Sequence, residues 1–227
     1  RGAPAAWTGS PGSVERLAPG GVVSVIGTLG GGAGRVAADV ALALAGQRDQ
    51  VVLTLDDGRE WGQGFHEELH RAGIAVVQLG TKSDIPRTMA CLGPSVVVQH
   101  SWLEFVDDPI RVGDERWVAI GHEPAAMPRG YDAYVNLSDY QAAFQRHLPV
   151  ESMVRIPNGV DLDRFPQVQR PREGPVTIAV LSRLTPEKFP RRFIENLPDL
   201  KALNARVLIA GRGPRRLEIE PDGQSAG

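Results

Sequence analysis

The sequence is nearly free of cysteine, with Cys91 as its single one among 227 residues. This excludes an intramolecular disulfide and fits a reducing compartment. No apolar run approaches the ~20 residues needed to span a membrane, and no basic stretch followed by an apolar one marks a secretion signal. We therefore expect a cytoplasmic protein.

The sequence also lacks an excess of either charge. Lys and Arg number 25 against 27 Asp and Glu, a net charge of −2. Because this gives no bulk attraction to phosphate backbones, we expect no nucleic-acid partner. No metal-ligand spacing occurs: His66, Glu67 and His70 could share a helix face, but such histidines are more often solvated. We expect no metal ion.

Short apolar segments alternate with helical patterns along most of the chain. The segments are continuous rather than alternating, which is typical of parallel strands covered on both faces. The predicted strands are 22–26, 51–55, 74–79, 96–99, 117–120, 134–137, 153–156, 176–181 and 207–210. The predicted helices are 35–45, with Val36, Val40 and Leu44 on one face, 60–72, a short one capped by Asp84, 138–147 opened by Ser138, and 190–197.

This order predicts an α/β fold with a doubly wound, mostly parallel, Rossmann-like sheet, followed by the beginning of a second Rossmann-like unit. Residues 1–21, rich in Ala, Pro and Gly, are expected to be a flexible arm with a short helix near 13–17. Residues 22–170 form the first predicted domain and residues 171–227 the second. About 50 residues is little more than one βαβ unit, so the second domain is predicted to be partial.

A glycine-rich turn, 27–34, follows the first predicted strand. Such a turn lets backbone N–H groups approach a phosphate, as in a dinucleotide site. Asp56 and Asp57 stand near the place of a ribose-binding acid, but the strict G-x-G-x-x-G spacing is missing. An ATPase loop is excluded because Arg35-Val36 occupies the place of Lys-Ser/Thr. A purely structural turn, with strand packed closely on helix, stays open.

A basic pair, Arg183 and Lys188, follows the first strand of the second unit. Cations at the carboxyl end of a strand between two α/β units indicate a cleft for an anion. The alternative is a solvated basic strand end.

Three motifs occur in a fixed order around this pair: I-P-N-G-V-D with Phe165, R-L-T-P-E-K, and A-G-R-G-P. The order resembles the retaining, nucleotide-sugar-dependent glycosyltransferases of the GT-B fold, in particular family 4, which typically carry IPNGVD…F, GRL…P-x-KG and G-x-GP. Two departures are Ser182, in place of the Gly before Arg, and Phe189, in place of the Gly after Lys.

The resemblance implies transfer of a sugar from a nucleoside-diphosphate sugar to a glycan, lipid or small-molecule acceptor with retention, and no cofactor. It also implies metal independence, since the Asp-x-Asp of Asp161 and Asp163 lies where the family uses no metal. Peripheral contact at the inner membrane face is a further implication. The turn G-G-A-G-R-V resembles the family's GGAERV, which lines the donor side of the cleft.

The resemblance further implies site residues. His122, after the strand 117–120, would face the sugar and acceptor, and His100 resembles a VVHaH segment beside the same cleft. A structural role stays open for each. Arg183 and Lys188 would stabilise the charge that develops on the leaving diphosphate. The implied catalytic residues are thus His122, Arg183 and Lys188, and the implied donor and phosphate contacts are Gly31, Gly32, Arg183, Lys188 and Gly213.

The family's acidic E-x7-E motif has no counterpart before Gly227. We therefore expect an incomplete transferase that needs a missing C-terminal portion or a partner chain, and the start at Arg1 suggests a processed, trimmed or excised piece. Two alternatives stay open: a non-catalytic glycan- or protein-binding module derived from such a transferase, and a dinucleotide-dependent oxidoreductase.

Overall fold

The computed structural model describes residues 15–55, 63–100, 108–165, 174–189 and 191–219. The chain divides into two compact units, 1–160 and 161–227, each described here by itself. The expected domain boundary at 170/171 lies outside the described residues. Of the short helix expected near 13–17, the described residues 15–17 are not helical.

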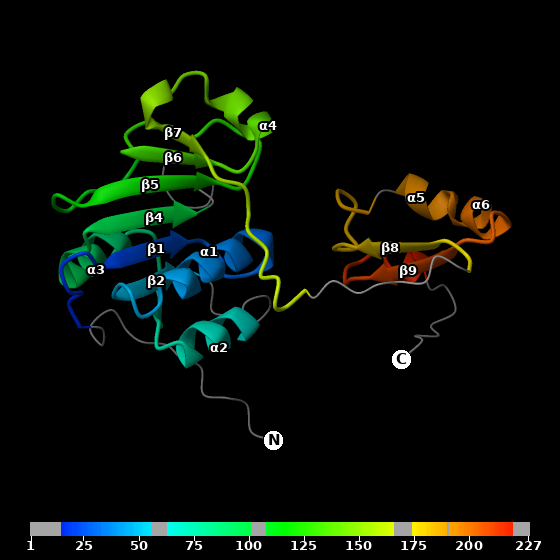
Figure 1. The fold of residues 1–227 in the computed structure, drawn as a ribbon, viewed down its shortest axis with the longest axis horizontal. Helices are drawn as coiled ribbons and strands as arrows, with labels where there is room; N and C mark the ends of the chain where they lie inside the picture. Colours follow the sequence, from blue (N-terminus) through cyan, green and yellow to red (C-terminus); the bar gives the residue numbers. More distant parts are fainter. Residues whose placement is uncertain (1–14, 56–62, 101–107, 166–173, 190, 220–227) are drawn as a thin grey trace. The chain divides into compact units, whose positions relative to one another are not determined.

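The described part of the first unit is built on a seven-stranded sheet in which every neighbouring pair is parallel. The strand order is β3-β2-β1-β4-β5-β6-β7, and Figure 1 shows most of these strands stacked in this order. Each strand coincides with a predicted one to within two residues, which confirms the α/β, doubly wound prediction. The strands are β1 (Val22–Ile26), β2 (Gln50–Thr54), β3 (Ala75–Gln78), β4 (Val96–His100), β5 (Arg116–Gly121), β6 (Ala133–Asn136) and β7 (Met153–Arg155).

The helices that connect successive strands pack against the sheet (Figure 1). Apolar clusters lie on both faces: one is centred on Val25, Val97 and Trp117, and another joins Ile26 and Val52 to the helix after β1. Such two-sided burial explains why the strands are apolar without alternation. The helices of this unit are α1 (Gly31–Leu44), α2 (Gln63–Arg71), α3 (Asp84–Leu92), α4 (Asp139–Ala142) and the 3₁₀ turns η2 (Ala143–Gln145) and η3 (Val150–Ser152).

The helix α1 differs from its prediction in two ways. It begins at Gly31, four residues earlier than expected, so the second half of the predicted glycine turn belongs to its first turn. Its buried face consists of Gly34, Ala37, Ala38 and Ala41 rather than Val36, Val40 and Leu44, which stay partly exposed. Small side chains let the helix approach the sheet closely: a Cβ at Gly34 would lie 2.2 Å from the carbonyl group of Leu29.

The N-terminal caps of two helices were predicted from the sequence, one at Ser138 and one at Asp84. Ser138 is the N-cap of α4, and its Oγ accepts a hydrogen bond from the Gln141 N–H at 3.2 Å, as predicted. This helix is shorter than expected, since the chain continues into the 3₁₀ turn η2. The Asp84 cap was wrong: Ser83 holds the cap position, and the Asp84 carboxylate accepts the Thr81 N–H at 2.9 Å.

The described part of the second unit has two parallel strands, β8 (Thr177–Leu181) and β9 (Arg206–Ala210), with three short helices. Its strands alternate between exposed and half-buried residues, because helices cover one face only. Leu181 and Leu208 are exposed. The expected helix at 190–197 appears as α5 (Arg191–Glu195), followed by α6 (Leu197–Ala202) and, after β9, α7 (Arg216–Ile219).

Candidate functional site

The candidate site in the first unit lies at the carboxyl ends of β1, β4 and β5. The strand order places β1 between β2 and β4, so the chain leaves β1 and β4 in opposite directions across the sheet. In open α/β sheets this switch point forms the crevice where ligands bind. The helix α1 starts just after β1, His100 ends β4, and His122 follows β5 directly.

The two histidines predicted from the sequence lie against each other. Nδ1 of His100 is 3.1 Å from Nε2 of His122, and the rings stack with centroids 5.4 Å apart and planes 18° from parallel. The contact arises because β4 and β5 are neighbours, with His100 opposite Ile120. His122, two residues beyond Ile120, therefore points to the same face of the sheet.

Both histidines are neutral at physiological pH. Burial, and then the repulsion of a charged His122, lower the pKa of His100 to about 3. Burial lowers the pKa of His122 to about 4. His100 is fully buried, whereas His122 is partly exposed. The pair can therefore offer hydrogen bonds to a ligand through His122 without placing a positive charge in the site.

The N-terminus of α1 adds a group of backbone donors beside β4. Gly31 has φ +67, and both Gly31 and Gly32 are exposed. No described atom lies within 4 Å of a Cβ built at either position. The N-cap Gly30 supplies no side-chain hydrogen bond, and the first turn holds no acidic residue. An uncapped helix N-terminus with open space around it favours an anion.

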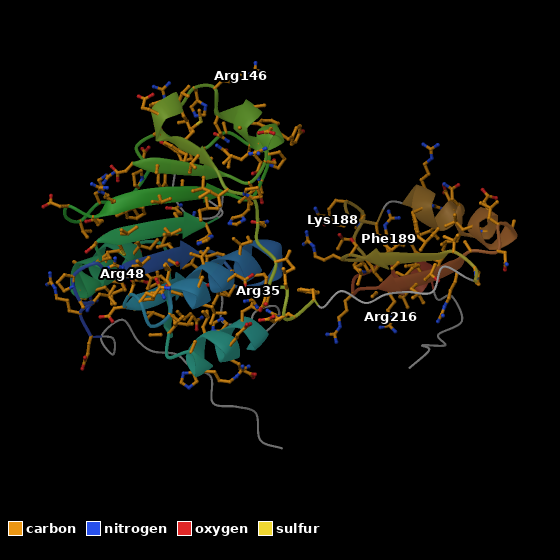
Figure 2. The ribbon with its side chains drawn as sticks, in the orientation of Figure 1. Arg35, Arg48, Arg146, Lys188, Phe189 and Arg216 are labelled. Carbon is orange, nitrogen blue, oxygen red and sulfur yellow. The ribbon has the colours of Figure 1, made fainter. Side chains whose placement is uncertain are left out.

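Arg35, the first cation of α1, does not serve this N-terminus. Its guanidinium donates to Glu68 and Asp39, both at 2.5 Å, and stands 4.7 Å from the centre of the Phe65 ring. Figure 2 labels Arg35. These contacts raise the pKa of Arg35, although burial alone would lower it. Arg35 therefore fastens α1 to α2.

Two further polar residues at this edge were missed by the sequence analysis. Gln99 and Asn136 end the apolar runs of β4 and β6, and both are buried. Among the described residues, Nε2 of Gln99 and Oδ1 of Asn136 have no hydrogen-bond partner. The Tyr131 hydroxyl donates to Oε1 of Gln99 at 2.8 Å. In the sequence, each could have been found as a polar residue at the end of an otherwise apolar strand.

In the second unit, Arg183 and Lys188 lie in the loop after β8 (Figure 2 labels Lys188). Both are exposed, and an Arg183 guanidinium nitrogen is 3.9 Å from a carboxylate oxygen of Glu187. A hydrogen bond from Thr185 lowers the pKa of Glu187, with a smaller contribution from Arg183. Lys188 lies in a turn, and the helix predicted at 190–197 begins after it, at Arg191.

Gly213 belongs to a close backbone junction within the second unit. A Cβ there would lie 2.4 Å from the carbonyl oxygen of Leu184, and φ is +149. Leu184 N–H donates to the Arg212 carbonyl at 2.8 Å, and Arg215 N–H donates to the Leu184 carbonyl at 3.0 Å. The R-L and G-R-G-P motifs therefore hold each other in place. A phosphate contact by Gly213 stays a prediction.

Phe189 explains one departure from the family pattern. It is buried and packs edge-on against Phe193 with ring centroids 5.1 Å apart. Leu184 is buried in the same unit. The aromatic side chain thus contributes to the small core of the second unit, where glycine would leave a void.

Asp56 and Asp57, the candidate ribose acids, lie outside the described residues. Within the described part of the chain, no group of three or more His, Cys, Asp and Glu side chains is placed to hold a metal ion. None of the helices that the structure describes is long and apolar enough to cross a membrane.

The structure is similar to several solved glycosyltransferases. The glycosyltransferase from Rickettsia africae ESF-5 aligns with a TM-score of 0.64 and 15% identity over 88% of this chain and 62% of its own. Anabaena Alr3699/HepE, solved in complex with UDP and glucose, aligns with a TM-score of 0.64 and 14% identity over 88% of this chain and 64% of its own. The lipopolysaccharide outer core galactosyltransferase WaaB, in its apo form, aligns with a TM-score of 0.56 and 12% identity over 88% of this chain and 63% of its own.

The fold is GT-B-like. The chain spans less than two thirds of the length of each of these structures. No protein-family model matches the sequence, and no curated protein matches it. The likeness therefore establishes the fold alone.

Proposed function

We propose that this chain is the larger part of a retaining glycosyltransferase, resembling family 4, that uses a nucleoside-diphosphate sugar. The observation that carries the proposal is the neutral pair of His100 and His122 beside the uncapped N-terminus of α1, at the switch point of a GT-B-like sheet. The donor class is supported by HepE, a structural neighbour solved with UDP and glucose.

Each residue has a proposed role. His122, partly exposed, hydrogen-bonds the sugar or the acceptor, which is a glycan, a lipid or a small molecule. The N–H groups at Gly31 and Gly32 face the donor phosphates. Arg183 and Lys188 stabilise the negative charge on the leaving diphosphate, the type of interaction that commonly supplies the largest catalytic contribution. The exposed pair of Arg183 with Glu187 is weak, so a diphosphate can replace it.

The second unit is proposed to be completed by further polypeptide, either a C-terminal portion or a partner chain. Within the described residues, β8 and β9 pair only with each other, and one face of this sheet stays exposed at Leu181 and Leu208. Parallel strands are normally buried on both faces. Until that face is covered, we expect weak donor binding.

Transfer is proposed to need neither a metal ion nor a cofactor. The proposed test of the function titrates the chain with a nucleoside-diphosphate sugar by calorimetry, with and without EDTA. It then follows the anomeric configuration of any product by NMR. Binding that vanished with EDTA, or a product of inverted configuration, would overturn the proposed mechanism.

A second candidate is a non-catalytic glycan- or protein-binding module derived from such a transferase. The carboxylate of Glu187 beside Arg183, and the uncovered sheet of the second unit, favour it. Binding of sugars without any transfer in the completed protein would support this alternative. A dinucleotide-dependent oxidoreductase has weaker support. The described feature that favours it is the N-terminus of α1, and this would suit the diphosphate of a nucleotide sugar equally well.

The proposed location is the cytoplasm, with peripheral contact at the inner face of the membrane when the acceptor is a lipid. Flotation with anionic vesicles tests the contact. Protein that stays at the bottom of the gradient would contradict it.

A further inference from the structure

The contact between His100 and His122 can hold its proton in two ways. A neutral imidazole carries one N–H, on either Nδ1 or Nε2. Either His100 Nδ1–H donates to His122 Nε2, or His122 Nε2–H donates to His100 Nδ1 across the same 3.1 Å. The first arrangement leaves Nε2 of His100 unprotonated and places the proton of His122 on its Nδ1. The second places the proton of His100 on its Nε2 and leaves Nδ1 of His122 unprotonated.

The far nitrogen of His100 distinguishes the two arrangements. Its Nε2 is buried and has no hydrogen-bond partner among the described residues. If His122 were the donor, His100 would carry its proton on this Nε2 and bury an N–H without an acceptor. Buried N–H groups without partners are rarer in proteins than under-satisfied acceptors. The arrangement with His100 as the donor is therefore favoured.

We propose that His100 is a positioning residue that donates its Nδ1–H to Nε2 of His122 and so fixes His122 as the Nδ1–H tautomer. The significance for sugar transfer rests on the proposed function. His122 Nδ1 has no partner among the described residues, and its ring is partly exposed. His122 then presents a hydrogen-bond donor to a substrate oxygen, and it does not accept a proton from a hydroxyl at that nitrogen.

The direct test is a long-range ¹H–¹⁵N correlation spectrum of the whole chain near neutral pH. The chain has five histidines, which single substitutions assign. We expect a protonated, pyrrole-type Nδ1 and an unprotonated, pyridine-type Nε2 for His122. A pyrrole-type Nε2 on His122 would overturn the inference, and this measurement needs no variant to fold.

Two matched variants test whether His100 is the cause. In His100→Asn the amide nitrogen stands as many bonds from the backbone as Nδ1, so it can still donate to His122. His100→Leu has a similar shape and no donor. We expect His122 to keep the Nδ1–H tautomer in the first variant and to become a mixture of tautomers in the second. An unchanged His122 spectrum in folded His100→Leu would contradict the proposal.

A transfer assay separates this inference from the proposed function. In the completed protein we expect His100→Leu to lower kcat by about 10–100-fold with little change in KM, by analogy with groups that orient metal-ligating histidines. His100→Asn should restore most of the rate. The predicted tautomer in a protein without transferase activity would sink the proposed function alone. Transfer with the opposite tautomer would sink the inference alone.

Discussion

At the scale of single residues, His100 and His122 show how a pair of ordinary side chains gains unusual properties. They stand 22 residues apart in the sequence, and neighbouring parallel strands bring them into contact. Burial keeps both rings neutral because a charged imidazole loses its hydration there. The unfolded chain pays no such penalty, so the pair couples stability to pH.

We predict that the free energy of unfolding falls as the pH drops below about 6.5. The folded pKa values, about 3 for His100 and about 4 for His122, lie below the ordinary value of 6.5. Between these values the unfolded state binds more protons, so acid favours unfolding and stability levels off above about 6.5. Each histidine should contribute up to ~1.4 kcal/mol per pH unit.

Urea unfolding at several pH values from about 5 to about 7 measures this slope. The window lies mostly above the range in which Glu115 and Asp132 titrate, because the pKa of each carboxyl is lowered. His100→Leu should have about half the slope. A flat profile across the window in the wild-type chain would contradict the neutral pair.

The sequence alone predicted where these residues lie but not how they meet. The resemblance to the glycosyltransferases implied that His100 and His122 lie beside one cleft. Their contact depends on β4 and β5 being neighbours in a given register, which apolar runs do not encode. Gln99 and Asn136 escaped attention because a polar residue at the end of an apolar run resembles an ordinary strand terminus.

At the scale of elements, α1 shows why its start was predicted four residues late. Glycine is a poor helix former, so the sequence indicated a loop up to Gly34. The structure instead forms a helix there, because Gly34 lets the first turn pack onto the Leu29 carbonyl. Tertiary packing overrides local propensity. The same packing leaves Gly31 and Gly32 exposed at the N-terminus of the helix.

We predict that Gly34→Ala destabilises the chain by about 1–3 kcal/mol or more, since the added methyl group would lie 2.2 Å from the Leu29 carbonyl group. Gly32→Ala is the matched control. Its Cβ would meet no described atom within 4 Å, and alanine favours helix, so stability should be unchanged or rise by up to ~1 kcal/mol. Thermal and urea unfolding measure both. Equal effects of the two substitutions would refute the close packing at Gly34.

At the scale of the whole molecule, the chain combines one complete parallel sheet with a short second unit. The sequence predicted both, because continuous apolar runs are typical of strands buried on two faces. In the second unit one face of the sheet is not buried, because Leu181 and Leu208 belong to apolar runs and stay exposed.

We predict that, in the completed protein, Arg183→Ala lowers kcat by roughly 10²–10³, the cost of removing one donor to transition-state charge. Lys188→Ala should behave similarly, and the double variant should lose less than the product, because both act on one phosphate group. Arg191→Ala is the control, since this exposed arginine pairs with Glu195 in a surface helix. If the first two variants matched the control in kcat/KM, Arg183 and Lys188 would be surface charges only.

The most direct test of the central claim is a titration of the ¹⁵N-labelled chain with UDP-glucose, followed by amide and histidine ring spectra, in the presence of EDTA. The account predicts saturable shifts at the amides of Gly31 and Gly32 and at the ring of His122, with smaller shifts when NAD replaces UDP-glucose. The absence of shifts at these three residues, or equal shifts with NAD, would contradict a nucleotide-sugar site at this edge of the sheet.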